Sequence, residues 1–340
     1  MTAFEAQDVY GEPSARDAAS QPVTTDETTV ESGRPATPLA VRALAELAGS
    51  FLVCFALYAI GSFGTSIYGA NMAFIAVGTA LAYAGVTMLL SGVSDAQLNP
   101  AVTLASVLVS RTPAIDGVAY VVAQVVGAIG AGAVLRFMLP TSSSIAEKVW
   151  LTPAVNGYAE GSVSYSTVNS VGISFGITMA IVVEVVASLI IVGTSLRRFA
   201  SSTSGTAAMG VAYGVGAAIT YPITGAALNP ARATGIALFA QGQGLTVEPL
   251  GQLWVFWVCP VLAAAVVSLA MIVAQMAQSA KHKRTAAPDD AAVAGDAAET
   301  AGASQDGETG FEGSDEHVYG EVAGQQADAQ SDADEGVERH

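Results

Sequence analysis

The sequence predicts an all-α membrane protein in which six transmembrane helices and two half-helices form an inverted repeat. The chain has 340 residues, of which 52% are hydrophobic and 12% are charged, and that charged share is about half the usual share in soluble domains. The apolar residues gather into six long runs. In addition, the segment Leu-Asn-Pro-Ala occurs twice, each time at the start of a shorter apolar stretch.

The net charge of −16 is confined to the two ends of the chain. Residues 1–40 and residues 281–340 are acidic and contain few large apolar side chains, so each is expected to be a disordered cytoplasmic tail. Residues 41–280 hold seven acidic and seven basic residues. This neutral segment is too apolar for a soluble domain. Because it has no basic stripe, we expect no nucleic-acid partner.

Each of the six long runs reaches, or nearly reaches, the length that a membrane span requires. A hydrocarbon core of about 30 Å needs about 20 apolar residues in a helix. An even number of spans leaves both termini on one side, where eight basic residues flank the runs, against two on the other side. The positive-inside rule therefore places both termini in the cytoplasm of a multi-pass cell-membrane protein. The runs are Ala43–Phe63, Met72–Leu90, Gly117–Leu135, Val171–Leu196, Gly205–Pro222 and Pro249–Ala280.

Two shorter apolar stretches, Asn99–Val109 and Asn229–Ala240, would cover about half of the bilayer as helices. Each begins with Asn followed by Pro, an order that suits a helix with Asn as its N-cap and Pro as its first residue. We therefore predict two half-helices. Their asparagine NH₂ groups are expected to remain free to donate hydrogen bonds into a central cavity.

The half-helices divide the middle segment into two similar halves, at about residues 41–137 and 170–280. In each half two spans precede the Asn-Pro-Ala motif and one follows it, and the first span carries a single acid, Glu46 or Glu184. Two halves of three spans each have opposite orientations in the membrane, so the half-helices enter from opposite faces and meet at the midplane. Their N-termini would offer N–H donors and partial positive charge to an uncharged solute.

Arg232 follows the second asparagine by three residues and is the only charged residue between Arg198 and Glu248. A charge at membrane depth is costly and usually marks a solute path. The alternative is an arginine whose side chain extends to the outer interface. We favour the solute path, because the short loop before the half-helix directs Arg232 toward the axis of the repeat.

The paired motifs, with Arg232 directly after the second, resemble those of the aquaporin (major intrinsic protein) family. The resemblance covers about residues 41–280, and it implies an aquaporin-like bundle with one pore per subunit and a homotetramer. Other segments that agree with the family are Ala45-Glu46, Gln124, Gly127-Ala128, Glu184 and Trp254–Pro260.

The resemblance also implies which residues form the pore. The central constriction would consist of Asn99, Pro100, Ala101, Asn229, Pro230 and Ala231. The outer selectivity filter would consist of Arg232, Ala226, Ala217 and Thr79, with Tyr83 as the alternative to Thr79. Glu46 and Glu184 would support the loops before the motifs by accepting backbone N–H bonds, and the alternative is that they couple transport to protons.

Two sets of residues disagree about the solute. Small residues at Thr79 and Ala217 would widen the filter, which favours glycerol or another small neutral solute. In contrast, Ala233 and Phe256-Trp257 agree with the water channels of the family. The prediction is a channel for passive water transport that excludes protons and ions, and a glycerol facilitator is the alternative. A secondary transporter is a more remote alternative, because its coupling-ion ligands would have to be Glu46 and Glu184.

We expect no enzyme activity, no cofactor and no metal site. The apolar segment has no Ser-His-Asp set, no metal-ligand set and no phosphate-binding loop, and the three histidines, His282, His317 and His340, lie outside it. Cys54 and Cys259 lie inside apolar runs and are predicted to pack as small hydrophobic side chains. The expected partners are therefore water, small neutral solutes and the lipid bilayer.

Overall fold

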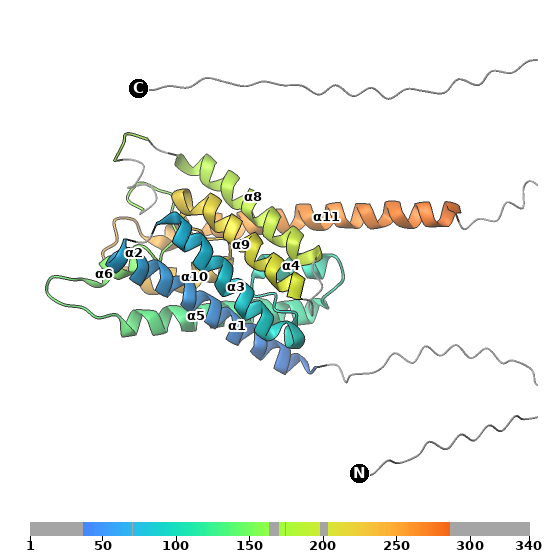
Figure 1. The fold of residues 1–340 in the computed structure, drawn as a ribbon, viewed down its shortest axis with the longest axis horizontal. Coiled ribbons are helices and arrows are strands. Elements are labelled where there is room, and N and C mark those ends of the chain that lie inside the picture. The colour runs from blue at the N-terminus through green and yellow to red at the C-terminus, as the bar shows by residue number, and fades with distance from the viewer. Residues whose placement is uncertain (1–36, 70, 163–169, 174, 198–202, 286–340) are drawn as a thin grey trace, which may run out of the picture. The chain divides into compact units, whose positions relative to one another are not determined.

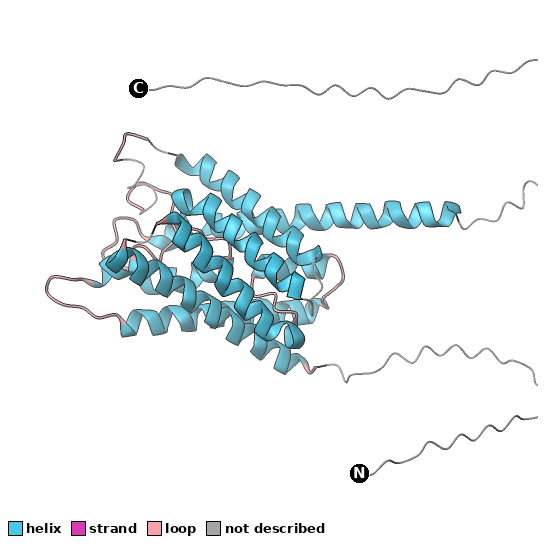
Figure 2. Cartoon of the chain, in the orientation of Figure 1, coloured by secondary structure: helices cyan, strands magenta, loops and turns pink. Residues whose placement is uncertain are grey.

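The computed structural model describes residues 37–69, 71–162, 170–173, 175–197 and 203–285. These residues form helices and loops, with no strand among them (Figure 2). The predicted acidic tails lie outside the described residues, apart from residues 37–40 and 281–285. The described residues between 37 and 280 belong to one compact unit, and the described part beyond it is only the end of the last helix.

Six long helices correspond to the six predicted spans (Figure 1). Two of them have irregular turns at one end, and short helices α2 (Thr65–Tyr68) and α6 (Glu147–Leu151) lie in the connections. The long helices are α1 (Leu39–Ala59, continued by the π-helical turn Ile60–Gly64), α3 (Met72–Ser94), α5 (Ala114–Met138), α8 (Gly176–Arg197), α9 (Thr203–Thr224) and α11 (Leu253–Thr285, preceded by the 3₁₀ turn Pro249–Gln252). Among the described residues, all of these except α9 are long and apolar enough to cross a membrane.

The two predicted half-helices are present as α4 (Pro100–Leu108) and α10 (Pro230–Ala240). Asn99 caps α4, because its Oδ1 accepts a hydrogen bond from the Ala101 N–H at 2.9 Å. Asn229 caps α10 in the same way, accepting from the Ala231 N–H at 2.9 Å. Proline is the first residue of both helices, where its missing N–H costs no hydrogen bond.

Close contacts between helix backbones hold the bundle together. Helix α1 packs along α5, α3 packs along α9, and α10 packs against α5. A Cβ atom added to Gly127 would lie 2.2 Å from the Leu47 carbonyl oxygen, and one added to Gly235 would lie 2.3 Å from that of Ala128. Small residues at these crossings allow the close approach on which helix association in membranes relies.

The bundle buries polar side chains and exposes large apolar ones, the reverse of a soluble protein. Phe74 and Leu81 of α3 are 54% and 67% exposed. Polar residues such as Ser50, Gln124 and Thr220 are fully buried. This distribution fits a bundle that faces lipid outside and a polar path inside. Both cysteines are buried free thiols, as predicted.

We expect Gly127→Ala to destabilise the protein, because the added methyl group would overlap the backbone of α1. Overpacking of this kind costs about 1–3 kcal/mol, and thermal unfolding in detergent would measure it. Gly193→Ala is the matched control, since an added Cβ there meets nothing within 4 Å. The control should stabilise α8 by about 0.5–1 kcal/mol. Equal unfolding temperatures for the two variants would contradict the tight α1–α5 crossing.

Candidate functional site

The loops that lead into the half-helices have matching, unusual backbones. Asp95, Ala96 and Leu98 have φ angles of 65°, 46° and 55°, and Gly225, Ala226 and Leu228, at the corresponding positions of the second loop, have 75°, 57° and 58°. Residues other than glycine rarely adopt this left-handed region, and they keep it only where the surroundings enforce it. The repeat predicted from the motifs therefore extends to the backbone of both loops.

Glu46 of α1 holds the first loop. Its Oε1 accepts hydrogen bonds from the Gln97 N–H at 2.9 Å and the Ser94 hydroxyl at 2.8 Å. Its Oε2 accepts from the Leu98 N–H at 2.7 Å and the Gln124 side-chain amide at 2.8 Å. An ionised carboxylate has acceptor sites for all four donors, so this fully buried side chain satisfies the loop N–H groups that point toward it.

Glu184 of α8 holds the second loop in the equivalent way. Its Oε2 accepts from the Leu228 N–H at 3.1 Å, and its Oε1 accepts from the Thr224 hydroxyl at 2.5 Å. Leu228 corresponds to Leu98 in the repeat, so the same backbone N–H is bound in both halves. Each glutamate thus faces hydrogen-bond donors of its own loop.

The two loops bring Asn99 and Asn229 together in the interior of the bundle. Asn99 Nδ2 donates to the Leu228 carbonyl at 3.0 Å, and Asn229 Nδ2 donates to the Leu98 carbonyl at 2.7 Å. Each asparagine therefore binds the loop of the other half. Pro100, Ala101, Pro230 and Ala231, the other motif residues, are buried beside them.

The expectation that both asparagine NH₂ groups are free was wrong. The second hydrogen of the Asn99 amide is donated to the Tyr213 hydroxyl at 2.9 Å, and that of Asn229 to the Tyr83 hydroxyl at 3.0 Å. Tyrosines from α3 and α9 thus occupy the donors that we expected to face a solute. Both tyrosines lie sixteen residues before the asparagine of their own half, a spacing that the sequence analysis overlooked.

Arg232 lies inside the bundle in the first turn of α10 and is 4% exposed. Its Nη1 donates to Oδ1 of Asn156, and its Nη2 lies 3.5 Å from the Gly225 carbonyl oxygen. Asn156 Nδ2 in turn donates to the carbonyls of Gly225 at 2.8 Å and Thr224 at 3.2 Å. Asn156, which the sequence analysis missed, therefore connects the arginine to the second loop. The Arg232 Nε has no hydrogen-bond partner among the described residues.

The other predicted filter residues, Thr79, Ala217 and Ala226, are all buried. Thr79 lies one helical turn from Tyr83, and Ala217 lies one turn from Tyr213. Helices α3 and α9 are antiparallel, because Gly210 faces Ala80 and Ala84 whereas Gly214 faces Ala76 and Ala80. Both side chains are therefore displaced from the tyrosines toward the same end of the bundle, by about 6 Å for four residues of helix.

Comparison with known proteins identifies the family. The sequence profile of the Major intrinsic protein family matches residues 36–271. The chain belongs to the major intrinsic protein family. Aquaporin Z from Brucella melitensis biotype 1 is 32% identical over 232 residues, which are 65% of this chain and 92% of that protein. The crystal structure of the aquaglyceroporin from Plasmodium falciparum matches with a TM-score of 0.51 at 17% identity, covering 68% of this chain and 95% of that one.

Family membership confirms the predicted fold class and makes the chain a multi-pass membrane channel rather than an enzyme. The family fold has six spans and two half-helices, so α9, the fifth long helix in chain order, is also a span, although it falls short of the apolar content of the other five. Its apolar content is low because it is rich in Gly and Thr. These small residues suit a helix that packs against both α3 and α8.

We expect Glu46→Ala to lower the unfolding temperature strongly. The substitution leaves the N–H groups of Gln97 and Leu98 without their acceptor, and an unsatisfied buried donor costs about 1–3 kcal/mol. Glu46→Gln should have a smaller effect, because it keeps one acceptor oxygen. Some destabilisation should remain, since its NH₂ group would face donors that the second carboxylate oxygen accepted from. Glu160→Gln, at an exposed site, is the control. If Glu46→Ala unfolded at the wild-type temperature, Glu46 would not support the loop.

Proposed function

We propose that this member of the major intrinsic protein family is a passive water channel of the cell membrane. The observation that carries the proposal is the meeting of two capped half-helix N-termini inside the bundle, where Asn99 and Asn229 each bind the opposite loop. The proposal includes a homotetramer with one pore per subunit and both termini in the cytoplasm. Those features are expected from the family resemblance and from the distribution of basic residues.

Water orientation follows from the polarity of the site. The N-terminus of each half-helix carries about half a positive charge, so a water molecule between the two points its oxygen toward them. Carbonyl groups of residues 95–97 and 225–227 would accept hydrogen bonds from water on either side. Opposed orientations in the two halves interrupt a chain of hydrogen-bonded waters and hence proton transfer, as is general for aquaporin-type pores.

Arg232 would act as the outer barrier. Its guanidinium is charged at every accessible pH, and hydrogen bonds to Asn156 and Gly225 hold it in place inside the bundle. A fixed positive charge beside the path raises the energy of a cation or a proton but not that of water. The repeat-equivalent residue in the first half is Val102, so this barrier exists only at one end of the pore.

The position of Tyr83 supports Thr79 as the fourth filter residue. Tyr83 lies at the level of Asn229, to which it is hydrogen-bonded, whereas Thr79 lies one turn outward with Ala217. A filter of Arg232, Ala226, Ala217 and Thr79 has three small side chains. This composition favours the second candidate function, which is facilitation of glycerol or another small neutral solute.

Full-length protein in proteoliposomes should accelerate osmotic water efflux. After a sucrose challenge, the vesicles should shrink faster than empty vesicles, and the rate should not change when a proton or sodium gradient is applied. A subsequent glycerol challenge tests the second candidate through the rate of reswelling. Shrinkage equal to that of empty vesicles, with inserted and folded protein, would contradict the water channel, whereas dependence on an ion gradient would favour a secondary transporter.

Arg232→Val should allow protons or cations to leak while water flux persists. The substitution removes the fixed charge and reproduces Val102 of the first half, so only the half-helix dipoles still oppose cations. Proton flux is measured with a pH-sensitive dye inside the vesicles. Arg136→Val is the control, because this arginine pairs with Glu147 outside the proposed pore. A leak no larger than that of the control would show that Arg232 is not the main barrier.

A further inference from the structure

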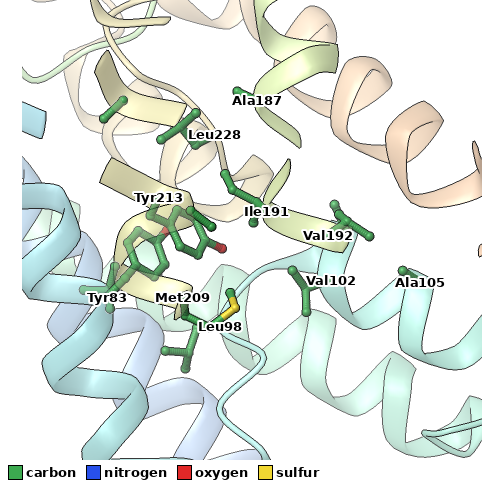
Figure 3. Packing of buried hydrophobic residues seen from close by; sticks show 14 of the residues in the cluster. Tyr83, Leu98, Val102, Ala105, Ala187, Ile191, Val192, Met209, Tyr213 and Leu228 are labelled. Carbon is green, nitrogen blue, oxygen red and sulfur yellow. The ribbon is translucent and has the colours of Figure 1, made fainter. Parts of the chain in front are cut away.

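Two stacked tyrosines lie in the interior of the bundle, beside the asparagines. The rings of Tyr83 on α3 and Tyr213 on α9 are parallel within 3°, and their centroids are 3.2 Å apart. Figure 3 shows the two rings lying face to face. The separation of the rings does not exceed the contact distance of carbon atoms, about 3.5–4.0 Å, so no water molecule fits between them.

The hydroxyl groups of this pair take the place of a solute. Each asparagine amide donates to the tyrosine of the opposite half: Asn99 to Tyr213 at 2.9 Å, and Asn229 to Tyr83 at 3.0 Å. These are the two donors that would otherwise point at the oxygen of a passing water. Since the remaining hydrogens of both amides are bound by Leu228 and Leu98, water can use either amide only by displacing a tyrosine or a loop carbonyl.

The pair is also the bulkiest level among the buried side chains of α3 and α9 on either side of the asparagines. On α3 the flanking buried residues are Thr79 and Thr87, one turn to either side of Tyr83. On α9 they are Ala217 and Met209, one turn to either side of Tyr213. The large rings therefore lie between levels with smaller or more flexible side chains. The level of Thr79 and Ala217 in particular has much smaller side chains than the tyrosine level.

We propose that Tyr83 and Tyr213 form the size-limiting constriction of this channel. The rings close the path at the level of the asparagines, and a solute passes when they separate. The pair, rather than the small residues around Arg232, then determines how fast water permeates and whether glycerol is excluded. This inference rests on the proposed function as a channel for water or small neutral solutes.

The double variant Tyr83→Val/Tyr213→Leu tests the inference in proteoliposomes. Removing both rings opens the level and frees both asparagine amides for water. Unit water permeability should rise about tenfold, which corresponds to about 1.4 kcal/mol of activation free energy. Glycerol permeability should rise by a larger factor, and the temperature dependence of water flux should weaken, because no ring has to move. Tyr83→Phe/Tyr213→Phe keeps the rings and should stay close to the wild-type permeabilities.

A second tyrosine substitution controls for general effects on packing. Tyr120→Leu removes a buried ring on α5 whose hydroxyl faces Arg42, outside the proposed pore, and it should leave both permeabilities unchanged. If the double variant does not insert as folded protein, the same permeabilities are measured for the single variant Tyr83→Thr. This substitution is conservative for α3, because Thr79 and Thr87 already occupy the buried positions one turn to either side. In either variant, water and glycerol permeabilities equal to those of the wild type would overturn the proposed constriction.

The outcomes also separate this inference from the proposed function. Wild type and variants that conduct water equally, and faster than empty vesicles, would leave the water channel in place and refute the tyrosine constriction. If every protein, including the folded double variant, matched empty vesicles for water and glycerol, the channel function itself would fail and the constriction with it.

Discussion

The interior of this protein depends on two buried carboxylates. Non-helical backbone at membrane depth has no water to satisfy its N–H groups, and the loops before α4 and α10 survive there because Glu46 and Glu184 accept their hydrogen bonds. The carboxylates also stabilise backbone angles that Ala96, Leu98, Ala226 and Leu228 would not adopt alone. With both loops in place, Asn99 and Asn229 come together, and each binds a loop carbonyl and a tyrosine hydroxyl of the opposite half.

The two halves are alike in architecture but differ in chemistry. Each half contributes a carboxylate, a left-handed loop, a capping asparagine and a tyrosine, and the asparagines exchange partners across the repeat. The halves differ at Arg232, because the equivalent residue of the first half is Val102. An inverted repeat would otherwise make the two ends of the path equivalent. The single arginine therefore places a charge on one side only of the paired asparagines, and Asn156 in the connection between the halves is hydrogen-bonded to it.

The tyrosine pair also offers a way to reconcile the conflicting indications about the solute. Small residues at Thr79, Ala217 and Ala226 indicate a wide filter, whereas other residues of the sequence agree with water channels. A bulky pair at the asparagine level permits both, because a wide outer level then lies in series with a narrow central one. Selection by size and exclusion of charge would in that case occur at different depths of the path.

The sequence alone determined the fold class, the half-helices and the single acidic residue in the first span of each half, because each depends on local or compositional signals. That these two residues anchor the loops was an expectation from the family resemblance. Helix spans follow from apolar length, and the starts of α4 and α10 follow from adjacent Asn and Pro residues. Glu46 and Glu184 stand out because acidic residues are rare in apolar runs. Only the tertiary structure decided the partners of Asn99 and Asn229, because those contacts join residues 114 and 146 positions apart in the sequence. Tyr83 and Tyr213 are ordinary residues of apolar helices until the antiparallel packing of α3 and α9 stacks their rings.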